Sequence, residues 1–538
     1  MGSSQLTLPT TPSPAAEPGS IGIAPGRALL LPCACALALA AFALLPFVQR
    51  SPNLPWTFLG TAGAILAWSA LLYARTRQSG RTLVLQVALR KQHYVQACAQ
   101  SLILIYWGMY WSGVPAFAPF IVAQLIFAYA FDSLLSWSRR DDYALGFGPF
   151  PVILSINLFL WFRLDWFHWQ FALVAVGYAA KELIRWTRQG RSVHIFNPSS
   201  FPLALASLVL ILTGTTNLTL GQEIASSQFN PPHIYAVIFL AALPGQLLFG
   251  VASMTLSAVI TAYAFALLYF NATGTYLFFD SHIPVAVFLG MHLLFTDPST
   301  SPRSELGRIM FGMLYGLGTI AVFGLLTLAG VPEFYDKLLP VPIMNLLVRV
   351  IERVAASDAL ARLDPARLGR ALAPAQRYVA YTSIWAGSFV VLSAAQGVGD
   401  EHPGQWLPFW ERACQDGRER GCEYLAVMHW NYCDRGSGWA CNELGILQAE
   451  RRIDRRAVLA FSRACSLGFS SGCENVARLT GGAATYARAG PPITDLPIVL
   501  RGSKAPVRER SPEALYALGC KRGWTELCTH QAGAGVAR

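Results

Sequence analysis

Long apolar runs separated by short polar or basic segments fill most of the chain between residues 28 and 396. A helix rises about 1.5 Å per residue, so about 20 apolar residues are needed to cross the hydrocarbon core of a bilayer. The pattern predicts an all-α fold with a polytopic membrane bundle of about 12 or 13 spans. The runs, several of them short or interrupted by proline, lie near 28–48, 56–74, 97–114, 116–135, 149–163, 167–184, 201–220, 233–251, 254–270, 284–296, 307–329, 338–350 and 378–396.

Arginine and lysine gather in every second connection between these runs. If the first run leaves the cytoplasm, the basic connections are all cytoplasmic, as the positive-inside rule requires. The other connections hold only Arg50, Arg163 and Lys337. This predicts a cytoplasmic N-terminus and a last span, 378–396, that carries the C-terminal residues outward. The basic connections contain Arg75, Arg77, Arg81, Arg90 and Lys91, Arg139 and Arg140, Lys181, Arg185, Arg188 and Arg191, Arg303 and Arg308, and Arg349, Arg353, Arg362, Arg367, Arg370 and Arg377.

Eight cysteines after residue 400 form four pairs with seven residues between the members of each pair. Cysteines eight positions apart on one straight helix would lie about 12 Å apart, whereas bonded cysteines have Cα atoms about 4.4 to 6.8 Å apart. The chain must therefore turn inside each pair, and glycines such as Gly417, Gly436, Gly468 and Gly523 permit such a turn. The pairs are Cys414 with Cys422, Cys433 with Cys441, Cys465 with Cys473, and Cys520 with Cys528.

We expect these pairs to form disulfides, because disulfides persist outside the cytosol, where the charge pattern independently places this region. Zinc is the competing explanation, but zinc sites usually have two to four residues between paired ligands. His429 and His530 are expected to be ordinary surface or packing residues. The stretch 481–511, rich in Gly, Ala, Pro and Arg, is expected to be a loop insertion.

The phrases around the cysteines repeat. Ser462-Arg-Ala-Cys465-Ser-Leu-Gly468 is similar to Glu411-Arg-Ala-Cys414, and Gly421-Cys422-Glu-Tyr-Leu to Gly472-Cys473-Glu-Asn-Val. Residues of about 405–530 resemble SEL-like, tetratricopeptide-related helical repeats in their cysteine-bridged form. The resemblance implies an α-solenoid whose surface contacts other proteins, here in the periplasm.

The composition supports a membrane class. Hydrophobic residues make up 54% and charged residues 13% of the 538 residues, and the formal net charge is +11. The positive charge lies in short clusters between apolar runs, which disfavours nucleic acid as a partner and favours membrane lipid. The predicted organisation is a disordered tail (1–27), a membrane domain (28–355), an Arg-rich inner linker (356–377), a last span (378–396) and the repeat domain (400–538).

Two short polar sequences stand at predicted inner ends of spans. One contains His194, Asn197, Ser199 and Ser200, and the other contains Thr296, Asp297, Ser299, Thr300, Arg303 and Arg308. In each, Asn or Asp followed by Pro and Ser precedes an apolar helix, which is typical of a helix cap. Two interpretations remain open: a pair of capped helices with basic anchors, or two helix N-termini that converge with the basic side chains into an anion or cofactor-phosphate site.

These motifs carry a family resemblance. The run His194-Ile-Phe-Asn-Pro-Ser-Ser-Phe201, the run Thr296-Asp-Pro-Ser-Thr-Ser-Pro302 with Gly307, Arg308 and Gly312, and Pro332-Glu-Phe-Tyr335 leading to Asn345 resemble the membrane subunit shared by the Rnf electron-transport complex (its D subunit) and the sodium-pumping NADH:quinone reductase (its B subunit). The similarity covers about 90–355. It implies inverted repeats of helices, a flavin carrier and electron transfer coupled to ion movement.

One feature of that family is missing. Its members attach FMN to a Thr in a Ser-Gly-Ala-Thr type sequence, and this chain contains no such sequence. The resemblance therefore implies noncovalent FMN or riboflavin rather than covalent FMN. Asp132, Lys181 and Glu182 lie near predicted span ends, where structural roles are favoured over catalytic ones.

The first functional hypothesis is an electron-transport subunit of a bacterial inner membrane, working with other subunits and with a periplasmic protein bound to its repeats. Two alternatives remain open: a channel or transporter without redox chemistry, and a membrane anchor for a periplasmic scaffold.

Overall fold

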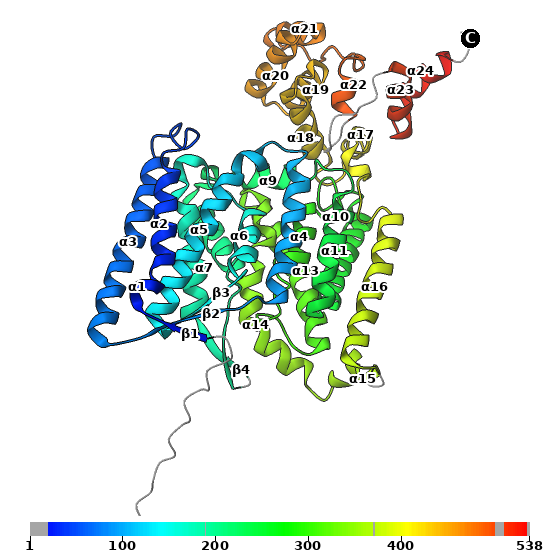
Figure 1. Cartoon of the computed structure of the whole chain (residues 1–538). Coiled ribbons are helices and arrows are strands. Elements are labelled where there is room, and N and C mark those ends of the chain that lie inside the picture. Colours follow the sequence, from blue (N-terminus) through cyan, green and yellow to red (C-terminus); the bar gives the residue numbers. More distant parts are fainter. Residues whose placement is uncertain (1–19, 189, 370–371, 501–510, 535–538) are drawn as a thin grey trace, which may run out of the picture. The chain divides into compact units, whose positions relative to one another are not determined.

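The protein is described here from a computed structural model, in which residues 20–188, 190–369, 372–500 and 511–534 are placed. Helices account for nearly all of the secondary structure, so the predicted all-α fold is confirmed (Figure 1). The chain divides into two compact units. The first comprises the described parts of Met1–Cys98, Phe117–Asn157 and Trp161–Pro202, and the second comprises those of Ala99–Ala116, Leu158–Leu160 and Leu203–Arg538.

The first unit is built around apolar helices joined by short strands. Phe58 stacks on Phe42 at 5.5 Å between ring centroids and meets Phe171 edge-on at 5.7 Å. Gly177 approaches the Pro198 carbonyl so closely that a Cβ would lie 2.2 Å from its oxygen. The helices are α1 (Pro25–Ala28), α2 (Leu30–Phe42), α3 (Leu54–Ser79), α5 (Gly113–Arg140), α6 (Pro149–Asn157) and α7 (His168–Leu183).

Two small sheets accompany these helices. In the first, β1 (Ser20–Ile23) pairs antiparallel with β2 (Leu83–Val87), which pairs parallel with β3 (Asp142–Leu145). In the second, β4 (Arg185–Arg188) and β5 (Arg191–His194) form an antiparallel hairpin. Residues 20–27 were predicted to be part of a disordered tail, but they form β1 and the start of α1, because backbone pairing with β2 does not need large apolar side chains. Residues 1–19 of the predicted tail lie outside the described residues.

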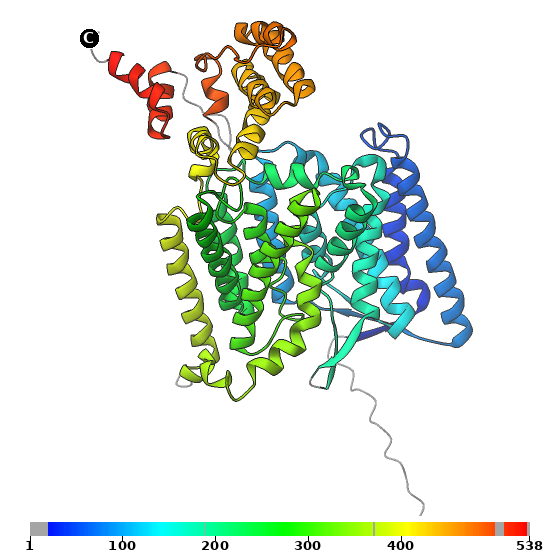
Figure 2. The ribbon, with the colours of Figure 1, turned by 180° about the vertical axis from the view of Figure 1, so that it is seen from behind.

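The second unit contains further apolar helices and the C-terminal repeats. Helix α16 packs against α10 and α11, along the edge at the right of Figure 1 and at the left of Figure 2. The apolar part consists of α8 (Ser200–Thr213), α9 (Gly221–Ser227), α10 (Ile234–Phe249), α11 (Ala252–Thr273), α12 (Val285–Leu293), α13 (Glu305–Ala329), α14 (Pro340–Ala355) and α16 (Pro374–Ala394), with α4 (Lys91–Gly108) leading into the unit.

Glycines let α11 and α13 pack closely. A Cβ on Gly312 would lie 2.1 Å from the Met254 carbonyl oxygen, and a Cβ on Gly316 would lie 2.8 Å from that of Ala258. The two glycines lie four residues apart on α13, and the carbonyls that they approach lie four residues apart on α11. Gly312 and Gly316 therefore form one stripe along α13 that faces the backbone of α11. Close approach through small residues at four-residue spacing is typical of helix pairs in membranes.

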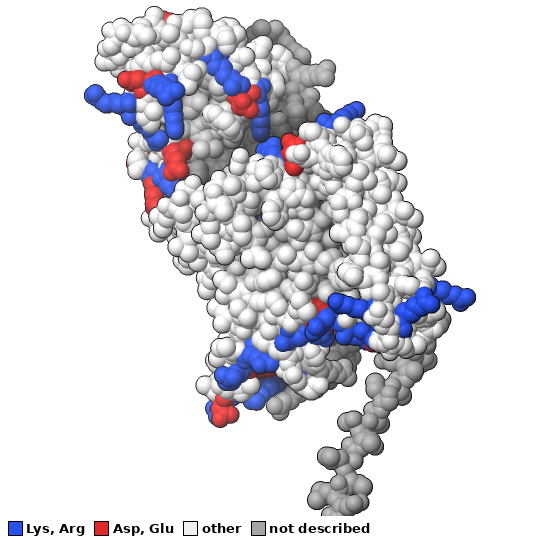
Figure 3. All heavy atoms as spheres, turned by 90° about the vertical axis from the view of Figure 1, so that its left-hand side faces the viewer, with Lys and Arg blue, Asp and Glu red and all other residues white. Residues whose placement is uncertain are grey.

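Five of the described helices are long and apolar enough to cross a bilayer: Pro25–Phe42, Leu54–Ser79, Gly113–Arg140, Ala252–Thr273 and Glu305–Ala329. Two shorter apolar helices, Ser200–Thr213 and Ile234–Phe249, accompany them. On the side of the molecule where α3 lies, Figure 3 shows a broad surface without charged side chains, bordered by a band in which Lys and Arg predominate. These features support a membrane protein.

Several predicted spans are shorter in the structure than the apolar runs that predicted them. The runs 149–163 and 284–296 give the helices α6 and α12, each only nine residues long. Every residue of α12, and every residue of α6 except the half-buried Phe150, is buried within the protein. Their apolar character therefore reflects burial among other helices, which sequence hydropathy cannot distinguish from contact with lipid.

The repeat domain is a series of antiparallel helices in which sequence neighbours pack together. Its helices are α17 (Leu407–Gln415), α18 (Gly421–Asp434), α19 (Gly438–Glu450), α20 (Asp454–Ser466), α21 (Ser470–Thr480), α22 (Leu496–Val499), α23 (Pro512–Lys521) and α24 (Thr525–Ala534). Between α21 and α23 the chain is largely irregular, as predicted for 481–511, apart from α22; residues 501–510 lie outside the described residues.

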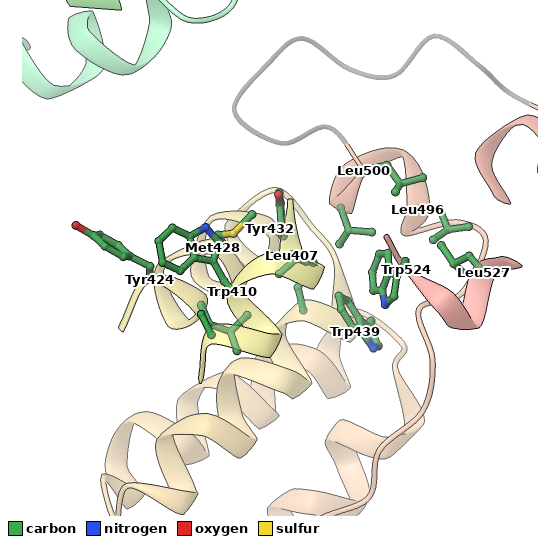
Figure 4. Packing of buried hydrophobic residues seen from close by; sticks show 14 of the residues in the cluster. Leu407, Trp410, Tyr424, Met428, Tyr432, Trp439, Leu496, Leu500, Trp524 and Leu527 are labelled. Atoms are coloured by element: carbon green, nitrogen blue, oxygen red, sulfur yellow. The ribbon is translucent and has the colours of Figure 1, made fainter. Parts of the chain in front are cut away.

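One hydrophobic cluster joins the beginning and the end of the repeat domain. Figure 4 shows Trp439 beside Trp524, with Leu496 and Leu527 near them, although these residues come from segments far apart in sequence. The same cluster includes Tyr276, from the connection between α11 and α12. The repeats are thus packed onto a connecting segment of their own unit.

Candidate functional site

The four predicted disulfides are present, and all form within pairs. Their Cα–Cα separations are 4.3, 4.6, 4.6 and 4.8 Å for Cys414–Cys422, Cys433–Cys441, Cys465–Cys473 and Cys520–Cys528. Each bridge clamps the turn between two helices. Gly417, Gly436, Gly468 and Gly523 adopt positive φ angles in these turns, which explains why glycine is found there.

The motif around Asn197 is a helix cap in the first unit. The Asn197 Oδ1 accepts hydrogen bonds from the Ser199 backbone N–H at 2.9 Å, the Ser199 hydroxyl at 2.7 Å and the Ser200 N–H at 3.2 Å. All three residues are buried. His194 is half-buried at the end of β5, where it pairs with Arg185. The Asn197 side chain therefore satisfies the first free N–H groups of α8.

The motif around Asp297, in the second unit, has similar local hydrogen bonds but forms a turn and not the start of a helix. The Asp297 carboxylate accepts from the Ser299 N–H at 2.9 Å, the Ser299 hydroxyl at 2.6 Å and the Thr300 hydroxyl at 3.2 Å. The Thr296 hydroxyl donates to the carbonyl of His292 at 2.7 Å. The capping prediction is therefore confirmed for Asn197 and wrong for Asp297, because α13 begins only at Glu305 and its N-cap is Ser304, whose hydroxyl accepts from the Gly307 N–H. The convergence of the two motifs into one anion site stays a prediction.

The basic residues of the second motif have structural contacts. The Arg308 Nη1 donates to the carbonyl of Gly250 at 2.6 Å, and its Nε donates to that of Pro302 at 3.2 Å. Arg308 is also 3.6 Å from the carboxylate of Glu305. The backbone N–H of Arg303 donates to Glu352 at 3.0 Å. Arg308 therefore ties the start of α13 to the end of α10.

The ionisable residues near span ends in the first unit are paired with one another. Lys181 lies 3.8 Å from Asp132, and Glu182 lies 3.2 Å from Arg140 and 3.8 Å from Arg185. These pairs fit the structural roles favoured from the sequence.

A group of buried polar side chains lies where α10, α12 and α16 meet. Within the described residues, no hydrogen-bond partner exists for the Gln246 Nε2 and Oε1, the His292 Nε2, the Thr382 Oγ1 or the Trp385 Nε1. Gln246 and His292 are each 2% exposed, and Trp385 is fully buried. A buried polar group without a partner costs about 1 to 3 kcal/mol, so each of these atoms calls for an explanation.

Ring contacts establish that His292 and Trp385 are neighbours, and the register of α10 and α16 places Gln246 and Thr382 relative to them. His292 lies 5.8 Å from the Trp385 ring, and Phe239 contacts both rings. Helices α10 and α16 are antiparallel, because Phe239 meets Phe389 and Trp385 while Gly250 meets Tyr378. Gln246 on α10 therefore lies at the level of Thr382 on α16. We call Gln246, His292, Thr382 and Trp385 the buried polar cluster.

The repeat domain contains a pocket of about 720 Å³ lined by α17, α18, α19, the segment 488–491 and the start of α24. Four glutamates line it: Glu411, Glu443, Glu450 and Glu526. We call it the acidic pocket. His429, expected to be an ordinary packing residue, is 2% exposed and lines the pocket. The side chain of His530 is outside the described part.

The sequence did not predict the buried polar cluster or the acidic pocket as sites. His292 was one of several isolated histidines, and Thr382 and Trp385 looked like ordinary members of an apolar run. The one usable signal was Gln246, an amide in the middle of the strongly apolar sequence Ile234–Phe249, since polar side chains inside membrane helices are often functional.

Comparison with known proteins adds no assignment, because no protein-family model, curated protein or solved structure matches this chain.

Proposed function

We propose that this protein is an electron-transport subunit of a bacterial inner membrane, with a noncovalent flavin, FMN or riboflavin, bound among the helices of its second unit. Its motifs resemble those of the Rnf and sodium-pumping quinone reductase membrane subunits. Ion movement coupled to electron transfer is part of the same proposal. Its repeat domain lies in the periplasm and docks a partner protein there.

The observation that carries the redox proposal is the buried polar cluster. The polar edge of a flavin ring needs hydrogen-bond donors and acceptors, and its faces stack on aromatic rings. Gln246 offers both a donor and an acceptor, Trp385 offers an N–H, and His292 offers a ring nitrogen. Phe239, Phe288 and Phe389 pack against the rings of His292 and Trp385.

Such a cofactor would accept and pass on electrons, and the chain's own residues would bind and orient it. A ligand held by Gln246 and Trp385 would satisfy buried groups that otherwise reduce stability. The short buried helix α12 supports this proposal, because interrupted helices inside membrane proteins commonly line ligand sites.

The periplasmic placement of the repeats is supported by the four disulfides, which form in oxidising compartments. It is also supported by the basic connections counted along the sequence. A reporter enzyme that is active only in the periplasm, fused after Arg538, would be active if the orientation is right. If the fused reporter enzyme is inactive because it lies in the cytosol, the periplasmic placement of the repeats is wrong.

Cofactor extraction tests the redox proposal. We expect full-length protein purified in mild detergent to release a yellow, fluorescent flavin on acid denaturation. Gln246→Leu and His292→Leu should lower the flavin content. Ser207→Ala is the matched control, because the buried Ser207 hydroxyl donates only within its own helix, to Leu203 at 2.6 Å.

One outcome would contradict the redox proposal, and another would contradict only the place assigned to the flavin. Protein that is fully folded and free of flavin removes its basis, and measurable solute flux through such protein in vesicles would establish the transporter alternative. Unchanged flavin content in both leucine variants would place the cofactor away from the buried polar cluster.

A further inference from the structure

The acidic pocket has an uneven charge. Among the residues that line it, four glutamates face a single cation, Arg488. This is an unusual concentration of negative charge in a protein whose formal net charge is +11. Carboxylates that share a cavity repel one another, so a site of this kind is stabilised by a bound cation.

The chain's own Arg488 shows that the pocket accepts a guanidinium group. Its Nη1 lies 3.2 Å from the carboxylate of Glu443, and its Nη2 lies 3.0 Å from that of Glu450. Arg488 is itself 57% exposed in its side chain, so this interaction is reached from solvent. Glu411 and Glu526 are left for a second cation.

Glu411 is the carboxylate best suited to receive that cation. Within the described residues, its side chain has neither a hydrogen bond nor an ion pair. Burial, and then the nearby charges of Glu443 and Glu526, raise the pKa of Glu411 to about 7. A partly buried carboxylate with carboxylate neighbours gains more from a cation than an exposed one does.

His429 provides a second, independent sign that the pocket takes a ligand. It is 2% exposed, and its Nδ1 has no hydrogen-bond partner within the described residues. Burial lowers the pKa of His429 to about 3, so the imidazole is neutral and can accept or donate a hydrogen bond. A buried ring nitrogen on the wall of the pocket is ready to pair with a polar group of an incoming chain.

The remaining wall is aromatic. Trp439 and Trp524 both line the pocket, and their ring centroids lie 5.6 Å apart. Figure 4 shows the two rings side by side although they come from α19 and the turn before α24. Tryptophan is the aromatic residue that most favours a cation beside its ring. The described residues contain no group of three or more His, Cys, Asp or Glu side chains able to hold a metal ion, which favours an organic cation over a metal ion.

We propose that the acidic pocket binds an arginine- or lysine-bearing segment of the partner protein, with the cationic group against Glu411 and beside Trp439 and Trp524. This inference rests on the docking role proposed above and names the chemistry of the partner. Charge complementarity identifies the occupant: an acidic or neutral segment would leave Glu411 and Glu526 without a compensating cation.

The test uses the full-length protein in lipid nanodiscs and a synthetic probe. The probe is a fluorescein-labelled, end-blocked peptide containing three Gly-Ser-Arg repeats, and its control contains citrulline in place of arginine. Fluorescence anisotropy at low salt and pH 8 measures binding. We expect the arginine peptide to bind at least tenfold more tightly than the citrulline peptide, which corresponds to about 1.4 kcal/mol.

Two substitutions with opposite expected effects locate the site. Glu411→Gln should weaken binding about tenfold, because it removes the carboxylate that receives the cation. Arg488→Gln should strengthen binding severalfold, because it frees Glu443 and Glu450 for the peptide, and a misfolded variant could not produce this gain. Glu474→Gln is the matched control: Glu474 is exposed on α21 and pairs with Arg478 outside the pocket.

The outcomes separate this inference from the proposals on which it rests. Equal binding of the two peptides, or affinity unchanged in both Glu411→Gln and Arg488→Gln, would overturn the cation assignment, while docking through another face of the repeats would stand. The expected pattern in protein that lacks flavin would support the pocket and overturn only the redox proposal.

Discussion

The contact between α11 and α13 offers a sharp test of the membrane part of the structure. Gly312 faces the carbonyl oxygen of Met254, and a Cβ at this position would lie 2.1 Å from that oxygen, where ordinary contact begins at 3.4 Å. The Ser257 hydroxyl, also 2.1 Å away, can rotate, but a helical carbonyl cannot move without its helix. Gly312→Ala therefore forces the two helices apart by about 1 Å.

The expected change in the free energy of unfolding of Gly312→Ala is the balance of two opposing effects. Replacing glycine by alanine inside a helix favours the helix by up to about 1 kcal/mol. Overpacking a well-packed contact usually costs about 1 to 3 kcal/mol, and separating the helices also weakens the neighbouring contact of Gly316. We expect a net loss of about 2 kcal/mol, which corresponds to roughly 2 °C in Tm for a chain of this size, because the entropy of unfolding grows with chain length.

The assay is thermal unfolding in mild detergent, followed by intrinsic tryptophan fluorescence at a fixed scan rate. Gly324→Ala is the control, because Gly324 lies on the same helix and a Cβ there meets nothing within 4 Å. This variant should unfold at the same temperature as the natural protein or slightly higher. If Gly312→Ala is as stable as Gly324→Ala, then α11 and α13 do not pack through their glycines and this part of the fold is wrong.

Three further predictions concern stability. Replacing Cys433 and Cys441 together by serine should destabilise the repeat domain by about 2.5 kcal/mol, the loop entropy of a bridge between residues eight apart, measured by urea unfolding against the natural protein. Burial lowers the pKa of His402 to about 3 and of His282 to about 4, so the neutral rings stabilise the folded chain fully above pH 6.5 and this stability is lost as the pH falls toward 4. His402→Asn should therefore lose less stability than the natural protein between pH 7 and pH 4, and equal losses would contradict the argument. The hydroxyl of Ser304 caps α13 by accepting a hydrogen bond at 3.2 Å, so Ser304→Ala should lower stability by about 1 kcal/mol, whereas Ser304→Asp should restore most of it in the same thermal assay.

The sequence predicted the local features of this protein well. Cysteine spacing, together with the compartment predicted from the charge pattern, gave the four disulfides and the turns between their members, because a bridge across eight residues demands a turn and glycine marks where the turn lies. The order Asn-Pro-Ser gave the cap of α8, because capping involves residues only two or three positions apart. The similar sequence Asp-Pro-Ser forms a turn, and Ser304 caps α13 instead. Apolar content gave a membrane protein, because it depends on composition and not on arrangement.

The tertiary structure decided everything that depends on residues far apart in the chain. Apolar runs cannot show whether they face lipid or other helices, so α6 and α12 emerged as short buried helices instead of spans. The buried polar cluster joins residues from three helices, and the acidic pocket joins Glu411, Glu443 and Glu526 across more than a hundred residues. Whether a buried polar group finds a partner depends on its neighbours in space, and a linear pattern does not contain them.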